Sequence, residues 1–163
     1  MKQFMKRVVL FAALYVATMA ACYAQGVSQV EAKVNEIVKK YEKTQGVECM
    51  NVVKGSGLGM LKTMLRGQFG KEFMRGVTGI TIIDYSDASQ EVCLALREEL
   101  EVFTSMLEEL KAGDGKKSDG NDYVRSFASL SEGDKSMSDF VIAVEDKDTK
   151  MIMYMAGKIK VED

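Results

Sequence analysis

The chain has 163 residues, of which 22 are basic and 24 are acidic, and it contains no His, no Pro and no Trp. Hydrophobic residues make up 47% of the sequence, which is enough for one globular domain and too much for a disordered chain. The lack of His excludes Ser-His-Asp and Cys-His catalysis and His-ligated zinc. The lack of Pro excludes a proline-rich linker or recognition segment.

Residues 1–24 have the pattern of a secretory signal peptide. Lys2, Lys6 and Arg7 precede an apolar run over residues 8–20, and small residues follow it. The run is shorter than the roughly 20 residues that a helix needs to span a bilayer. We therefore expect a cleaved signal and not a membrane anchor.

The expected cleavage site lies between Ala24 and Gln25. The same region also resembles a bacterial lipobox, because Met19 to Cys22 read Met-Ala-Ala-Cys, so lipidation of Cys22 is the alternative. Both routes predict export to the periplasm or cell envelope of a Gram-negative bacterium. Contact with the membrane is expected only through a lipidated Cys22.

The chain that remains after cleavage is mildly acidic. Removal of residues 1–24 takes away three basic residues and leaves 19 basic and 24 acidic ones, a net charge of −5. Nucleic-acid binding requires clustered Lys and Arg, and here the basic residues are scattered among acidic ones, so we expect no nucleic-acid partner. Residues 25–163 are expected to form a single α+β domain.

The first expected helix begins at Ser28, which forms a Ser-x-x-Glu capping pattern with Glu31. Apolar residues then recur at helical spacing as far as Tyr41, and the helix is expected to end near Gly46. The Val-rich residues 47–53 predict a strand, because glycines bound them on both sides.

A glycine-rich stretch at residues 55–59 lacks the spacing of dinucleotide and phosphate-binding loops, so we interpret it as a turn or a helix start. Apolar residues at helical spacing over 58–73 predict a second helix, with a bend or break near Gly67 and Gly70. Residues 78–85 are the clearest second strand.

The rest of the chain predicts one long helix over residues 88–110, a flexible loop over 112–121, and strands over 123–130, 139–144 and 151–161, with a hairpin turn at 145–148. The element order is therefore α-β-α-β-α-β-β-β. This order predicts an α+β fold in which three helices pack on one face of a largely antiparallel sheet of about five strands.

Two cysteines remain after cleavage, Cys49 on an expected strand and Cys93 near the start of the long helix. In an oxidising compartment they are candidates for a disulfide, but sequence does not give the distance between the two Cα atoms. Two buried free thiols, or one reactive or metal-binding thiol, are the alternatives.

Methionine alternates at Met151, Met153 and Met155. On a strand this alternation places the three thioethers on one face, where they are candidate ligands for Cu(I). Core packing is the competing interpretation, because Met fills irregular core space and the usual companion ligand, His, is absent. We therefore predict no resident metal or cofactor and no catalytic residues, and we interpret the many carboxylates as solvated faces.

Four segments resemble a family of small exported proteins of Gram-negative anaerobes that is classed as a domain of unknown function. The segments are residues 41–47, 79–83, 140–144 and 155–159, and the similarity extends over about residues 30–160. The resemblance implies an envelope protein, and association with extracytoplasmic sigma-factor regulators implies a stress-response or sensing context. It implies no catalytic residue.

Export, a compact α+β pattern and the lack of a catalytic set favour a non-enzymatic envelope module that binds an envelope protein or a small ligand. This hypothesis predicts a contiguous exposed apolar patch. The alternatives are a His-independent enzyme that uses carboxylate, Lys, Tyr or Cys groups, which predicts a pocket where groups with shifted pKa converge, and Met-based handling of Cu(I).

Overall fold

The computed structural model of the chain describes residues 28–110, 123–131 and 135–160. The expected signal peptide, with Cys22, Ala24 and Gln25, lies outside the described residues, as does the loop expected over 112–121.

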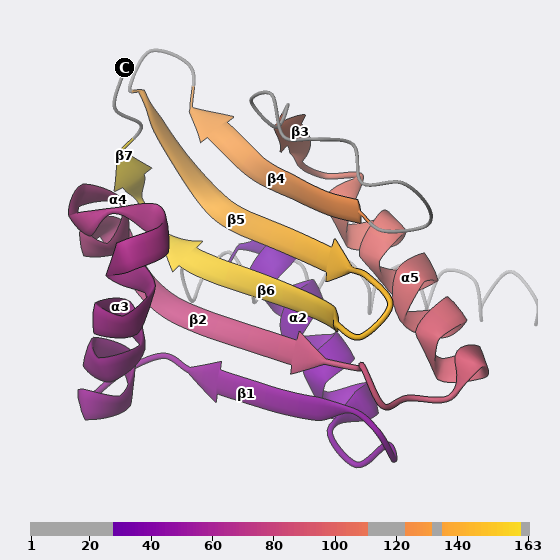
Figure 1. Cartoon of the computed structure of the whole chain (residues 1–163). Coiled ribbons are helices and arrows are strands. Elements are labelled where there is room, and N and C mark those ends of the chain that lie inside the picture. The colour runs from indigo at the N-terminus through magenta and orange to yellow at the C-terminus, as the bar shows by residue number, and fades with distance from the viewer. Residues whose placement is uncertain (1–27, 111–122, 132–134, 161–163) are drawn as a thin grey trace, which may run out of the picture.

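An antiparallel sheet forms the centre of the molecule (Figure 1). The described strands are β1 (Glu48–Val52), β2 (Val77–Asp84), β3 (Glu108–Leu110), β4 (Tyr123–Ser131), β5 (Ser136–Glu145), β6 (Lys150–Gly157) and β7 (Ile159–Lys160). Their spatial order is β1-β2-β6-β5-β4-β3, and β7 pairs with β5. The α+β class and the antiparallel pairing are confirmed, and the short strands β3 and β7 bring the described sheet to seven strands instead of about five.

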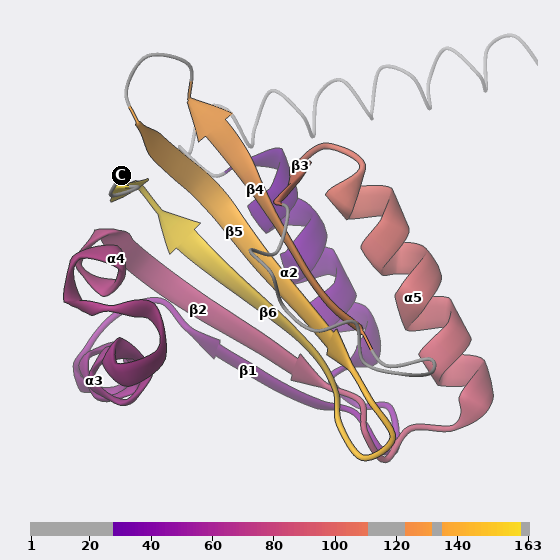
Figure 2. The same cartoon turned by 45° about the horizontal axis from the view of Figure 1, so that its top comes forward.

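The helices lie on both faces of the sheet, which corrects the expectation that they share one face (Figure 2). Helices α2 (Gln29–Tyr41) and α5 (Gln90–Thr104) lie side by side on one face, which we call the closed face. Helices α3 (Ser56–Phe69) and α4 (Lys71–Gly76) lie on the other face, at one end of the strands. The physical reason is that the central strands carry apolar side chains on both sides, so both faces require cover.

The core under the closed face is formed by the apolar sides of α2 and α5 packed on the sheet. Val34, Leu96 and Phe103 are at most 1% exposed, and they pack with sheet residues such as Ile83 and Tyr154. Each of the two helices has a serine cap, because Ser28 Oγ accepts from Glu31 N at 3.0 Å and Ser89 Oγ accepts from Val92 N at 3.3 Å. The predicted capping role of Ser28 is confirmed.

The core on the other face is formed by one end of the strands with α3 and α4. Met74, Ile80 and Met155 are buried there. The apolar residues of α3 pack against this cluster, but they are themselves only partly buried. The predicted break lies at Gly70, whose φ of +85° ends α3 and starts α4. No side chain of α3 is fully buried.

The long helix ends earlier than its apolar spacing predicts, and residues 108–110 form β3 instead. Thr104 Oγ1 donates to Leu100 O at 2.6 Å, and Ser105 Oγ donates to Val102 O at 2.6 Å. Hydroxyls that bond to the preceding turn compete with the helix backbone, which explains the early end.

Two glycines hold α4 against the C-terminal strands. A Cβ on Gly76 would lie 2.1 Å from Lys158 O, and a Cβ on Gly157, whose φ is +133°, would lie 2.1 Å from Gly76 O. The two backbones therefore touch where α4 passes into β2, and only glycine fits on either side of the contact.

Candidate interaction face

The sheet face that carries α3 has a part that no described helix covers (Figure 1). Directly paired residues of neighbouring strands point to the same side of a sheet, so the register defines two rows of side chains there. We call these two rows the open face: Glu48, Asp84, Met151, Val144 and Val124 in the first, and Met50, Ile82, Met153, Ile142, Ser126 and Leu110 in the second.

The open face is mostly apolar and partly exposed. Val124 is 66% exposed and Met50 is 50% exposed, at opposite edges of the two rows. Between them Ile82, Ile142 and Met151 are half-buried. The two rows therefore form a partly exposed apolar surface, which is the kind of surface that the hypothesis of a binding module predicts.

Helix α3 forms a wall at one end of the open face. Its Lys62 Nζ donates to Val77 O at 2.8 Å, at the start of β2. Residues two positions away lie nearly on the opposite side of a helix, so Met60 and Met64 are turned away from that strand end. They are 68% and 66% exposed.

An acidic cavity lies at the other end of the open face. It has a volume of about 290 Å³ and is lined by Gly46, Val47, Glu48, Asp84, Ser86 and Asp87. Asp84 Oδ1 accepts from Ser86 N at 2.9 Å and from Ser86 Oγ at 2.7 Å, which fixes its carboxylate. The first row of the open face therefore runs directly into the carboxylates of Glu48 and Asp84.

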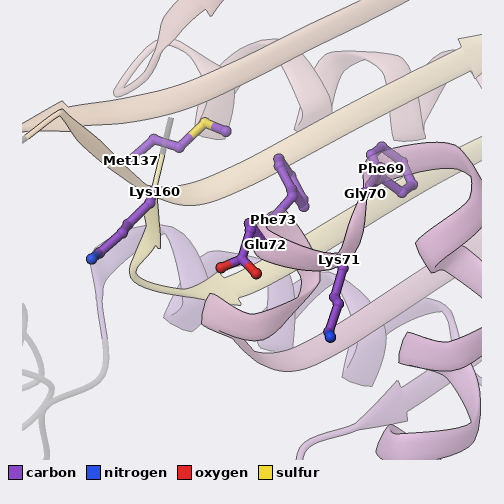
Figure 3. A pocket seen from close by; sticks show the side chains of 7 residues that line it. All are labelled: Phe69, Gly70, Lys71, Glu72, Phe73, Met137 and Lys160. Carbon is purple, nitrogen blue, oxygen red and sulfur yellow. The ribbon is translucent and has the colours of Figure 1, made fainter. Parts of the chain in front are cut away.

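A second cavity lies beside α4, between this helix and the strand residues Met137 and Lys160 (Figure 3). It has a volume of about 350 Å³ and is lined by Phe69, Gly70, Lys71, Glu72, Phe73, Met137 and Lys160. We call it the α4–β7 pocket. A neighbouring cavity of about 210 Å³ shares Glu72 and Lys160 with it and adds Arg75, Gly76 and Lys158.

A buried carboxylate joins the start of α2 to the sheet. Asp139 is 8% exposed, and its Oδ1 accepts from Ser28 Oγ at 2.6 Å and from Tyr154 OH at 2.7 Å. Burial, and then the charge of Asp139, raises the pKa of Tyr154 above its usual range. Burial, with Asp139 as a smaller cause, also raises the pKa of Glu31.

A second buried carboxylate, Glu145, lies at the other end of the closed face. Arg97 binds both of its oxygens, and Tyr123 OH donates to Oε2 at 3.1 Å. Burial, followed by the neighbouring Tyr123, raises the pKa of Tyr85. Asp139 and Glu145 line none of the three cavities described above, so these networks connect elements and do not form a described pocket.

The two cysteines are free thiols in the structure. Cys49 is half-buried on β1, Cys93 is buried on α5, and both pack on the core under the closed face. Burial, and then Glu42, raises the pKa of Cys49, which disfavours its reactive thiolate.

The alternating methionines lie on one side of β6, as the spacing predicts. Met153 is 7% and Met155 is 0% exposed, so both belong to the core, and Met151 is half-buried against it. Among the residues that the structure describes, no group of three or more His, Cys, Asp or Glu side chains is placed to hold a metal ion. The Cu(I) site stays a prediction for Met151, Met153 and Met155.

Sequence reasoning did not identify the open face or the acidic cavity. Both depend on which strands become neighbours, and that pairing is long-range. The only local signal was that residues 79–83 and 151–155 are apolar on both sides of their strands.

Comparison with known proteins identifies a family for this chain but no individual similar protein. The family model described as "Domain of unknown function (DUF4252)" matches residues 27–163. No curated protein matches the chain, and no solved structure matches it. Within residues 28–110, 123–131 and 135–160, no helix is both long enough and apolar enough to cross a membrane.

Proposed function

The chain belongs to the DUF4252 family, a domain of unknown function, and from that premise we propose that it is a non-enzymatic interaction module of the cell envelope. The open face binds its partner, which is a basic, amphipathic segment of another protein. One observation carries the proposal: a row of apolar side chains crosses the sheet and ends at two carboxylates, Asp84 and Glu48.

The apolar part of the partner is defined by the open face. Removal of side chains such as Val124, Met50 and Met151 from water on binding supplies roughly 25 cal/mol per Å². Methionine side chains are flexible and polarisable, and a surface rich in them adapts to partners of different shape. Four methionines, Met50, Met60, Met64 and Met151, are accessible on this side of the molecule.

The charge of the partner is defined by the acidic end. Glu48, Asp84 and Asp87 line the cavity there, and the exposed Glu108 lies on the same side of the sheet at its β3 edge. A Lys or Arg side chain of the partner fits this cavity, while acidic segments are repelled. Charge complementarity of this kind selects the partner and its orientation more than it adds affinity.

Export is part of the proposal, because residues 1–24 combine a basic start, an apolar run and small residues in the order of a signal peptide. Mass spectrometry of the N-terminus of the protein isolated from cells tests it. Gln25 as the first residue supports a released periplasmic protein, and a lipidated Cys22 supports an anchored one. An intact Met1 contradicts export.

The binding test uses two synthetic helical peptides of equal length, one built from Leu and Lys and the other from Leu and Glu. Binding is followed by NMR of protein labelled with ¹³C at its methionine methyl groups. We expect the basic peptide to shift the signals of Met50 and Met151 and the acidic peptide to shift neither. The proposal is contradicted if both peptides shift the Met50 and Met151 signals equally, or if neither peptide shifts them.

Two pairs of variants locate the site. Val124→Ser with Ile142→Ser should weaken binding of the basic peptide, whereas Leu94→Ser with Val102→Ser, at exposed apolar positions of α5, should not. Glu48→Gln with Asp84→Asn should also weaken binding of the basic peptide, because it removes two carboxylate charges. Asn is chosen at position 84 because its side-chain oxygen can still accept from Ser86. The matched control is Glu91→Gln with Glu98→Gln on exposed positions of α5.

A further inference from the structure

The α4–β7 pocket has a rigid aromatic floor that the interaction face does not use. The rings of Phe69 and Phe73 are stacked with centroids 5.3 Å apart, and both meet Phe140 edge-on, at 6.3 Å and 5.2 Å. Met137 completes the apolar lining. Mutually packed rings hold their positions, so the floor is formed before any ligand arrives.

The rim of this pocket is strongly basic, although residues 25–163 carry a net charge of −5. Lys71 and Lys160 extend from opposite sides of the pocket, and the Glu72 carboxylate lies between them (Figure 3). Arg75 Nη1 binds that carboxylate at 2.7 Å, so an arginine already compensates its charge. Lys158 adds a further cation in the neighbouring cavity.

This local charge follows from the sequence of the α3–α4 region. Residues 54–76 contain five basic residues and one acidic residue, Glu72, and residues 158–160 bring Lys158 and Lys160 beside α4. Lysine carries its charge on a flexible four-carbon chain, so two lysines at opposite rims can both turn toward one anion above the floor.

We infer that the α4–β7 pocket binds an amphipathic organic anion, a carboxylate or similar group attached to an apolar body. The body lies on Phe69, Phe73 and Met137, and the anion is held by Lys71 and Lys160. Fatty acids and aromatic carboxylates share this chemistry. A cavity of about 350 Å³ has the size typical of small-molecule sites.

The test titrates the purified exported protein with octanoate and 1-naphthoate, and with 1-octanol and 1-naphthalenemethanol as their uncharged counterparts. The reporter is the ¹³C methyl signal of Met137, assigned by its loss in Met137→Leu. We expect at least one of the two anions to shift Met137 and leave Met50 and Met151 unmoved. The anion with the higher affinity shows whether an acyl chain or an aromatic ring packs better on the aromatic floor.

Charge dependence is tested with the better anion. We expect its uncharged counterpart to bind at least about fivefold more weakly. Lys71→Gln with Lys160→Gln should weaken binding of the anion about five- to tenfold, because the variant removes two exposed charge pairs that each contribute modestly. Lys39→Gln with Lys43→Gln, at exposed positions of α2 and the turn after it, is the matched control and should leave affinity unchanged.

Three results overturn the inference: no shift of Met137 with either anion, equal binding of the anion and its uncharged counterpart, or equal weakening by the two double variants. A shift of Met50 or Met151 in place of Met137 also overturns it, because the anion then lies on the open face. The first three results leave the basic-peptide test untouched, because that test uses another surface. An anion on the open face would in addition contradict the expected preference of that face for basic segments.

Discussion

Among the helices that the structure describes, α2 and α5 cover the closed face of the sheet along its length, whereas α3 and α4 cover one end of the opposite face (Figure 2). The closed face buries large side chains such as Leu96 and Phe103 completely, and α3 buries none of its own. The two faces share the same strands, so the difference arises from the helices. The closed face therefore contributes most of the buried core, and the opposite face keeps more of its side chains partly exposed.

The largest expected effect comes from a core truncation under the closed face. Leu96→Ala should lower the free energy of unfolding by about 3 kcal/mol, because Leu96 is fully buried and its removal leaves a cavity. Met151→Ala on the open face should cost less than about 1.5 kcal/mol, since Met151 is only half-buried. Urea denaturation measures both. Equal losses would contradict the distinction between the faces.

The next effect tests how α4 is held on the sheet. Gly76→Ala places a Cβ 2.1 Å from Lys158 O, so the backbone must move, and we expect a loss of about 2 kcal/mol or more. The same variant should shift the methyl signal of Met137, which lines the α4–β7 pocket, and leave that of Met50 in place. Retention of wild-type stability and of the Met137 signal would contradict the close contact.

A smaller effect of opposite sign is expected on α3. Gly67 lies inside this helix, with nothing near its Cβ position and without a positive φ. Gly67→Ala should therefore stabilise the protein by about 0.5–1 kcal/mol, because alanine loses less backbone entropy in a helix. Thermal unfolding of the variant measures this gain. Gly70→Ala is the control and should not stabilise the protein, because Gly70 has a φ of +85°.

The smallest effect depends on pH and lies at the start of α2. The pKa of Glu31 is raised above 4.5 by burial and then by Asp139. The folded state therefore favours the protonated form, and the charged form lowers stability as the pH rises through the folded pKa. Glu31→Gln should raise the denaturation midpoint at about pH 7 and lose this gain at about pH 3.5, where both states are protonated.

The control for this pH dependence is Glu91→Gln, which removes a carboxylate from the first turn of α5, where it is exposed. If the denaturation midpoint at neutral pH rises equally in the two variants, the stabilisation comes from removing a carboxylate at a helix end in general and not from the neighbouring Asp139.

The sequence predicted most elements because their signals are local. The Ser28 cap, the break at Gly70 and the turn at 145–148, where Asp146 N donates to Thr149 O at 2.8 Å, all depend on neighbouring residues. The predicted end of the long helix, at residue 110, was wrong, because hydroxyl groups compete with the helix backbone at Thr104 and Ser105.

The arrangement of helices and the candidate site could not be predicted in the same way. Their positions depend on contacts between distant residues, such as the 111-residue separation between Ser28 and Asp139. The apolar pattern of residues 151–155 indicates two buried sides but not which helix covers each of them. The acidic cavity joins Glu48 to Asp84 through the register of β1 with β2, which no single segment contains.

The shallow packing of α3 also affects how large the open face is at any moment. A helix with no fully buried side chain separates from its sheet at a lower free-energy cost than the unfolding of the whole domain. Ile80, Met155 and Phe140 lie beside the two rows and belong to the cluster on which α3 packs, so such an opening would uncover part of this cluster while α4 still contacts it. A partner long enough to follow the strands would capture this transient state and take the place of α3.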